Sequence, residues 1–226
     1  MSKKNKQNIA PQSVGGKKGS FFEENTKSIT FIVSGVIILL LLYIGYQRLY
    51  LAPRADRAAN EMYMAEQYAT IDSLQRQAID GDGSYLGFKE IADEYSNTKS
   101  ANIANAYLGG LYLKQGEYEN AITYLEKYSS TGSHILDPLI IGLIGDAYSE
   151  LKEFNKAVDF YQKAVKKSNN EYTAPLFLKK LGLVYEELND FEKAEDAYRK
   201  IKTDFPSSHE AEEIEARLAR VRAKAE

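Results

Sequence analysis

The stretch PLIIGLIGDAYSELKEFNKAVDFYQKAVKKSN, residues 138–169, decides the fold of this chain. In its second half, apolar residues recur every three or four positions, which places them on one face of a helix. They are Phe154, Ala157, Val158, Tyr161, Ala164 and Val165. Asp137 and Pro138 precede the first half and predict a helix start, since Asp caps free amides and Pro suits the first turn. The stretch therefore predicts two amphipathic helices, whose apolar face one pair alone cannot bury.

Two further segments, residues 102–133 and 175–206, align with this stretch without internal gaps, at spacings of 36 and 37 residues. Small or aromatic residues recur at four places in each repeat. These are Gly109, Gly145 and Gly182; Tyr112, Tyr148 and Tyr185; Ala121, Ala157 and Ala194; and Leu125, Tyr161 and Tyr198. We expect Gly109 and Ala121 where paired helices approach closely, and the aromatic residues in the wider gaps. Gly116 and Asn189 fall in turns, where a positive φ is often needed.

The pattern resembles the tetratricopeptide repeat, which has a small eighth residue, an aromatic eleventh, Ala at positions 20 and 27, an aromatic at position 24 and Pro at position 32. Positions 8, 11 and 20 match in all three repeats. The departures are Leu125 at position 24, Tyr128 and Ile201 at position 27, and a closing Pro only at Pro206. The predicted fold class is therefore all-α, a tetratricopeptide-repeat solenoid preceded by a single transmembrane helix.

Flanking helices extend the repeats at both ends. Ala58–Asp80 is expected to form one long helix or two shorter ones, and Gly81 to Gly83 break the pattern. Tyr85–Tyr95 places Phe88, Ile91, Ala92 and Tyr95 on one face, like the second helix of a degenerate leading repeat. After the repeats, Ser207 and Glu210 predict a capping box. The stripe that follows predicts a polar-backed cap on the stack. It contains Ala211, Ile214, Leu218 and Val221.

An uncharged run covers residues 28–47, and its apolar part reads ITFIVSGVIILLLLYIGY. At about 1.5 Å per residue, twenty helical residues span a bilayer core of about 30 Å. A cleaved signal peptide is the alternative, but the run is longer than a signal's apolar region and no clear cleavage pattern follows. Six lysines precede the run against two glutamates, and three arginines follow it. This bias favours a cytoplasmic N-terminus, with the solenoid on the other side of the membrane.

Charge is unevenly divided along the chain. The first 57 residues hold nine Lys and Arg against three Asp and Glu, whereas the remaining residues hold 20 against 29. An acidic body argues against nucleic acid as its partner, because phosphate binding needs clustered cations. The chain has no Cys, which removes disulfides, thiolate metal sites and thiol nucleophiles.

Residues that would carry chemistry are sparse. The two histidines, His134 and His209, are about 75 residues apart in predicted inter-helix segments. Asp80 and Asp82 lie near a glycine pair but lack the rest of a calcium-loop ligand series, so a turn is the simpler interpretation. No glycine-rich phosphate loop is present. We therefore expect no enzyme activity, no cofactor, no metal site and no small-molecule substrate.

A binding surface is the remaining kind of site. In tetratricopeptide solenoids the inner face is lined by positions 2, 5, 9 and 12 of each first helix. In this chain those positions are Ile103, Ala106, Gly110 and Leu113; Leu139, Gly142, Asp146 and Ser149; and Leu176, Lys179, Leu183 and Glu186. A groove that binds a peptide segment is predicted from six of these residues: Ile103, Leu113, Leu139, Leu176, Lys179 and Leu183. The alternative is that they pack against flanking helices or a neighbouring repeat.

The predicted organisation is a disordered Lys-rich cytoplasmic tail (1–27), a transmembrane helix (28–51), leading helices with a degenerate repeat (52–100), three repeats (101–206) and a capping helix (207–226). This arrangement resembles the YfgM-like family of ancillary Sec translocon subunits. The resemblance implies a single-pass protein of the bacterial inner membrane with a periplasmic solenoid. It also implies protein partners, namely translocon subunits, periplasmic chaperones or unfolded secreted chains. The alternatives are a scaffold for cell-envelope assembly or division and an organelle import receptor with a cytosolic solenoid.

Overall fold

The computed structural model describes residues 25–168 and 170–225, which form two compact units divided after residue 50. Most of the predicted disordered tail therefore lies outside the described residues. Every described element is helical, as predicted. The sequence-based fold class, an all-α solenoid with one long apolar helix before it, is confirmed.

The first unit contains the helix α2, Thr26–Tyr46, and most of a π-helical turn, Gln47–Leu51. Twenty-one helical residues extend about 31 Å, the thickness of a bilayer core. Apolar side chains cover α2 on all sides and none is buried. Among the described residues, one continuous helical stretch, Thr26–Ala69, is long and apolar enough to cross a membrane, and α2 forms its first part.

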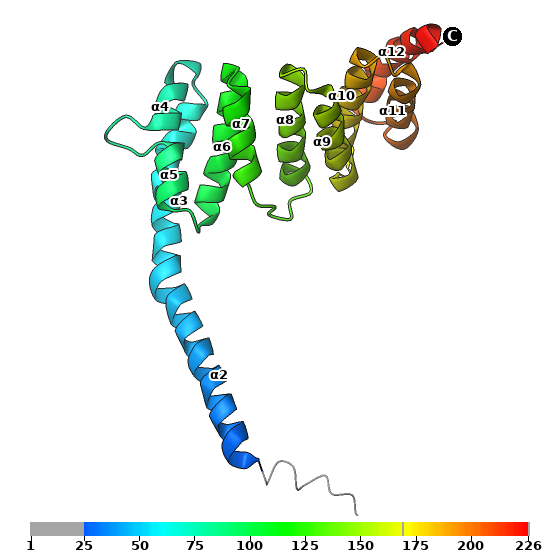
Figure 1. Ribbon diagram of the computed structural model, residues 1–226. Helices are drawn as coiled ribbons and strands as arrows, with labels where there is room; N and C mark the ends of the chain where they lie inside the picture. Colours follow the sequence, from blue (N-terminus) through cyan, green and yellow to red (C-terminus); the bar gives the residue numbers. More distant parts are fainter. Residues whose placement is uncertain (1–24, 169, 226) are drawn as a thin grey trace, which may run out of the picture. The chain divides into compact units, whose positions relative to one another are not determined.

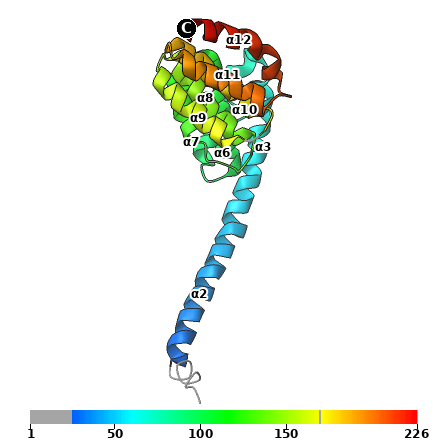
Figure 2. The same cartoon turned by 90° about the vertical axis from the view of Figure 1, so that its right-hand side faces the viewer.

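The second unit is a row of helices that pack in sequence order (Figures 1 and 2). The leading part has α3 (Ala52–Ala69), a 3-10 turn (Asp72–Leu74), α4 (Gln75–Asp80) and α5 (Phe88–Glu94). The predicted helical stretch before Gly81 is therefore divided between α3 and α4. The repeats follow as α6 (Lys99–Gln115) with α7 (Tyr118–Lys127), α8 (Leu136–Glu150) with α9 (Phe154–Lys167), and α10 (Thr173–Glu187) with α11 (Phe191–Asp204). The last helix is α12, His209–Ala225.

Glycine permits the close contact within each helix pair. A Cβ at Gly109 would overlap Leu125, and one at Gly145 would lie 2.8 Å from the Tyr161 ring. At Gly182 it would overlap Tyr198. The large residue at position 24 of each repeat therefore packs directly on the backbone at position 8. The prediction that Gly109 is small because paired helices approach closely is confirmed.

The turn inside each repeat uses one residue with a positive φ. Gly116 has φ of 79° and Asn189 has φ of 58°, as their turn positions predict. The second repeat uses Lys152, with φ of 62°, at a turn where the sequence has neither Gly nor Asn to predict it. A lysine is uncommon in this conformation, since its Cβ disfavours the left-handed region.

The predicted helix starts are wrong in three places. Asp137 lies inside the first turn of α8 and does not cap it; the free amide of Leu136 donates to Ser133 Oγ instead (3.0 Å). Before α12, the capping oxygen is that of Ser208 rather than Ser207, and it accepts from the Ala211 amide (3.2 Å). The helix predicted from Tyr85 begins only at Phe88.

Asp82 explains the late start of α5. Its Oδ1 accepts the amides of Ser84 and Tyr85, both at 2.8 Å, and so holds these residues in a turn. The apolar face predicted for this segment is nevertheless confirmed, since Phe88, Ile91, Ala92 and Tyr95 are all buried.

Candidate binding surfaces on the inner face

The first hollow on the inner face is apolar. It has a volume of about 410 Å³ and lies between α6 and α8, with the end of α3 closing one side. Ile103 and Leu139, both predicted groove residues, line it and are half-buried. The other lining residues are Ala69, Thr70, Ala106, Tyr107, Gly110, Leu111, Leu136, Ile140 and Leu143. The hydroxyls of Thr70 and Tyr107 are the only polar side-chain groups among these lining residues, so this hollow suits an aliphatic or aromatic side chain.

The second hollow, also of about 410 Å³, is polar and lies towards the C-terminal ends of α6, α8 and α10. Leu113 and Leu183 of the predicted groove line it together with a half-buried ionic cluster. Lys180 Nζ donates to both oxygens of Asp146, at 2.7 and 2.5 Å. The Tyr161 hydroxyl donates to Asp146 Oδ1 at 2.7 Å.

These contacts set the electrostatics of the polar hollow. Burial, followed by the nearby Asp146 carboxylate, raises the pKa of Tyr161 well above its ordinary value, so the phenol stays neutral and donating. Because Lys180 is neutralised by Asp146, the remaining charge is that of the exposed Glu150, to which the Tyr118 hydroxyl donates at 3.4 Å. The hollow therefore offers acceptors to a cation or an amide.

The remaining two predicted groove residues do not line either hollow. Leu176 packs against the apolar core shared by the second and third repeats and α12. Lys179 donates to Glu213 Oε2 of α12 at 2.8 Å. The neighbouring inner-face residue Glu186 accepts two hydrogen bonds from Arg220 of α12, at 2.8 and 2.7 Å, and one from Tyr198. At this end of the solenoid, the inner-face charges thus serve to attach the last helix.

The motif positions predict which helix face lines the inner side of the solenoid. They do not predict which side chains of neighbouring helices contact one another there. Lys180, one position after Lys179, is the lysine that enters a hollow. Gly142 was assigned to the inner face, but a Cβ there would overlap the Phe177 ring of α10, which covers that position. Ala69 and Thr70, at the end of α3, line the apolar hollow although they precede Ile103 by more than 30 residues. No local periodicity encodes that contact.

Neither histidine occupies a hollow. His134 lies in the loop before α8, where its carbonyl accepts from Asn170 (2.9 Å). His209 begins α12, with its ring nitrogens 3.7 Å from Glu212 and Glu213. Among the described residues, no group of three His, Asp or Glu side chains is placed to hold a metal ion.

Comparison with known protein families places a tetratricopeptide repeat-like domain over residues 73–184 and a further tetratricopeptide repeat over residues 180–208. Residues 73–208 are therefore a tetratricopeptide-repeat region, and the solenoid described above is the fold of that class. Proteins with this fold are scaffolds for protein–protein interaction.

Among individual relatives, tetratricopeptide repeat protein 29 from Macaca fascicularis is 31% identical over 87 residues, and its Homo sapiens counterpart is 32% identical. The alignment covers 37% of this chain but only 18% of those proteins. Two solved structures are similar in fold, each with a TM-score of 0.50. One is a MamA protein, 20% identical over 74% of this chain and 91% of its own; the other is the MamA RS-1 ArsTM double mutant, 17% identical over 91% and 98%.

Proposed function

We propose that this protein is a membrane-anchored scaffold that binds protein segments on the inner face of its solenoid, at the periplasmic exit of the Sec translocon. In this proposal α2 is the anchor, and the partners are translocon subunits, periplasmic chaperones or unfolded secreted chains. The observation that carries it is the apolar hollow between α6 and α8, lined by Ile103 and Leu139, in a chain that also bears a bilayer-length apolar helix.

The two hollows suit an extended, unfolded segment. Both are lined by α6 and α8, and they involve positions about seven residues apart on each helix, or about 10 Å along its axis. An extended chain covers that distance in about three residues. A segment that places an apolar side chain in the first hollow therefore presents a neighbouring amide or cation to Glu150 in the second. Such contacts select for kinds of side chain and not for one particular sequence. A protein that binds many different secreted chains needs this kind of selectivity.

The orientation rests on the charges that flank α2. Lysines 3, 4, 6, 17, 18 and 27 precede the helix, and this excess of positive charge is typical of a cytoplasmic end. The solenoid is then periplasmic, a location with which the absence of Cys is compatible. The resemblance of the whole arrangement to the YfgM-like family supports the same assignment, by analogy.

Site-specific photocrosslinking in intact cells tests the proposal. A photoreactive phenylalanine analogue replaces Leu139 in the full chain, and in a control replaces Asp159, an exposed residue of α9 that lines neither hollow. After irradiation, the chain is purified in detergent and its adducts are identified by mass spectrometry. We expect translocon subunits, a periplasmic chaperone or secreted chains to be attached at position 139 and not at 159.

Two results would overturn this assignment. Adducts at position 139 with division or outer-membrane assembly proteins would assign the scaffold to those machines instead. Equal adducts at positions 139 and 159 would show that the inner face has no special role in binding.

A further inference from the structure

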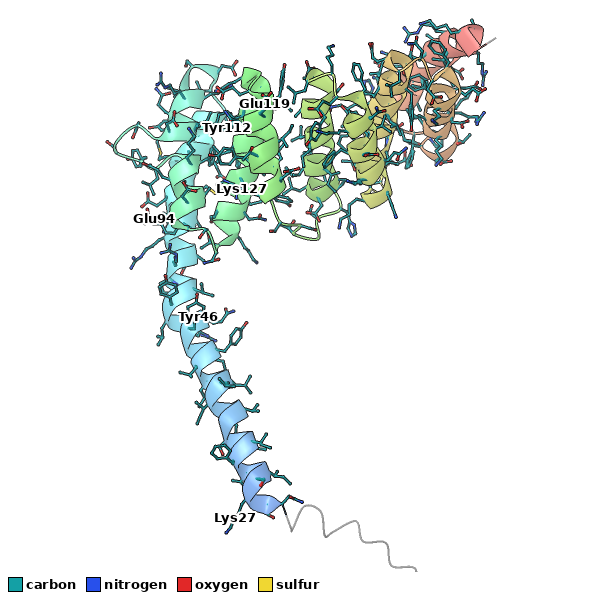
Figure 3. All side chains as sticks on the ribbon, in the orientation of Figure 1. Lys27, Tyr46, Glu94, Tyr112, Glu119 and Lys127 are labelled. Carbon is teal, nitrogen blue, oxygen red and sulfur yellow. The ribbon has the colours of Figure 1, made fainter. Side chains whose placement is uncertain are left out.

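Two of the three repeats carry the same three-layer stack of side chains. In the first repeat, Tyr112 of α6 stacks on Tyr124 of α7 with ring centroids 5.5 Å apart, and Lys127 Nζ lies 4.6 Å from the Tyr124 centroid (Tyr112 and Lys127 are labelled in Figure 3). In the second, Tyr148 stacks on Phe160 at 5.4 Å, and Lys163 Nζ lies 4.5 Å from the Phe160 centroid. A tyrosine, a central ring and a lysine therefore lie together in both repeats, and a further lysine lies over the tyrosine, Lys89 at 5.7 Å in the first repeat and Lys156 at 4.8 Å in the second.

The third repeat keeps the two outer layers and lacks the central ring. Tyr185 and Lys200 occupy the positions of Tyr148 and Lys163, but Ala197 stands where the second repeat has Phe160. At this place a cleft of about 860 Å³ opens between α9 and α11, and Tyr185, Ala197 and Lys200 all line it. It shares no lining residue with either inner-face hollow.

The floor of this cleft is apolar and its rim is cationic. Val165, Leu178 and Leu181 form the apolar part together with Ala197 and the ring of Tyr185. Gln162 Nε2 donates to the Tyr185 hydroxyl at 2.9 Å, and Lys193 Nζ lies 5.5 Å from that ring. Both are exposed, flexible side chains that an incoming group can displace.

The rim has an excess of positive charge within an otherwise acidic region. Lys166, Lys193, Arg199 and Lys200 stand against Asp196 and Asp204. Two of these cations already have partners, since Lys193 pairs with Asp190 at 2.6 Å and Arg199 with Asp196. Within the part of the chain that the structure describes, Lys166 and Lys200 form no ion pair.

We propose that the cleft between α9 and α11 is a second binding site, for an acidic peptide segment that carries an aromatic side chain. The ring enters the space beside Ala197, between Tyr185 and Lys200, and restores the three-layer stack of the other repeats. Carboxylates beside the ring pair with Lys166 and Lys200. The chain's own first 24 residues have the wrong charge for this role, with five lysines and two glutamates. The site stands independently of the inner face, because the two surfaces share no lining residue.

The experiment measures binding of a short fluorescent peptide, one Phe flanked by Asp and Glu, to the full chain in lipid nanodiscs. Anisotropy is expected to show saturable binding that weakens as salt increases. Ala197→Phe installs the side chain of the second repeat and should reduce affinity by at least about tenfold, because the space for the ligand ring is filled. Lys166→Glu combined with Lys200→Glu should reduce peptide affinity by a similar factor. Both lysines are exposed, so these substitutions should leave the fold intact. The matched control is Lys163→Glu, the equivalent of Lys200 in the stack that is already complete, and it should bind like the unaltered chain.

Other outcomes would overturn the proposal. Unchanged binding by Ala197→Phe would show that the ring does not enter this cleft. Equal binding of a peptide with Lys in place of the acidic residues would contradict the proposed carboxylate contacts. Equal binding of a peptide with Ser in place of Phe would contradict the proposed ring contact. Loss of binding on Leu139→Glu with retention in Ala197→Phe would place the peptide on the inner face. If light scattering showed that the unaltered chain self-associates and that Ala197→Phe does not, the occupant would be a second copy of the chain.

Discussion

Gly109 and Gly110 are neighbours on α6, yet only one of them has room for a methyl group. A Cβ at Gly109 would overlap Leu125 and lie 3.2 Å from the Ala121 carbonyl, whereas one at Gly110 would meet nothing within 4 Å. The difference arises because Gly109 faces its own partner helix, α7, and Gly110 lines the open inner face.

We predict opposite effects of alanine at these two positions. Gly109→Ala should destabilise the solenoid by about 1–3 kcal/mol, since Leu125 and the helix backbone must shift. Gly110→Ala should be neutral or stabilising by up to about 1 kcal/mol, because alanine is the better helix former. Urea denaturation of the two variants in detergent, followed by circular dichroism, measures both. Similar midpoints for the two variants would contradict the close packing of α6 on α7.

Asp137 is another residue whose role depends on its contacts. It is only 2% exposed, and it accepts from the amides of Thr131 and Gly132, both at 3.0 Å. The hydroxyls of Tyr128 and Ser130 donate to it as well. Burial alone would raise the pKa of Asp137, but these hydrogen bonds outweigh it and lower the pKa to about 2.

We predict that Asp137 makes the solenoid sensitive to acid. Because its folded pKa lies below its unfolded value of about 3.9, its contribution is complete above that value and is lost as pH falls towards 2. Asp137→Asn should cost about 1–3 kcal/mol at neutral pH, since the NH2 group that replaces one carboxylate oxygen cannot accept from the loop donors. It should also remove the dependence of stability on pH that Asp137 causes in this range. Asp159→Asn, at an exposed position, is the control for removal of a carboxylate. A profile of Asp137→Asn that parallels the unaltered chain between pH 4 and 2 would refute the assignment.

At the scale of elements, the sequence predicted the helices of the repeats well and their first residues poorly. A helix face is encoded by many residues at a 3.6-residue period, so one ambiguous position does not alter it. A helix start is chosen by one side chain among several nearby candidates. Ser133 and Asp137 are both candidates to cap α8, as Ser207 and Ser208 are for α12. At α8 the tertiary fold determines the choice, because Asp137 accepts hydrogen bonds from the preceding loop instead.

In the candidate site, too, the helix face could be predicted from the sequence, but the individual contacts could not. Motif position identified the helix face that carries Ile103 and Leu139. It did not identify Lys180 or the Phe177 ring over Gly142, because those contacts depend on how neighbouring first helices pack. The outer cleft is detectable in the sequence only by aligning the repeats and noticing that Ala197 replaces Tyr124 and Phe160.

The element α12 ends the solenoid by packing as another first helix would. Its residues Ile214, Leu218 and Val221 are buried on the last repeat, and ion pairs to Lys179 and Glu186 flank them. We predict that Leu218→Ala costs about 2–5 kcal/mol through the lost apolar contact and the cavity. Ala219→Ser, at the exposed neighbouring position, should cost little.

The effect of Leu218→Ala should remain local, because each repeat of a solenoid contacts only its neighbours. Hydrogen exchange read by mass spectrometry should show lost protection in α10 to α12 and unchanged protection in α6 and α7. Uniform loss along all repeats would mean that the solenoid unfolds as a single cooperative unit.

At the scale of the whole molecule, the chain joins two units with opposite requirements for solvent. The α2 unit exposes apolar side chains throughout, and contact of so large an apolar surface with water is unfavourable. The solenoid buries its apolar residues and has the charged exterior of a water-soluble body. The proposed scaffold function needs both, since an interaction surface at a membrane must be held there.

We predict that α2 alone retains the protein in the membrane. Val36→Arg with Leu39→Arg places two charges near the centre of the helix, each costing about 2.5–3.5 kcal/mol there. The unaltered chain should stay in the membrane pellet through an alkaline carbonate wash, and the double variant should appear in the soluble fraction with its solenoid still folded by circular dichroism. Ala216→Arg with Ala219→Arg adds the same charge to exposed positions of α12 and should leave the chain in the pellet. If the α2 variant stays in the pellet, the solenoid itself binds the membrane or a resident partner, and the inner-face crosslinks would then identify what holds it.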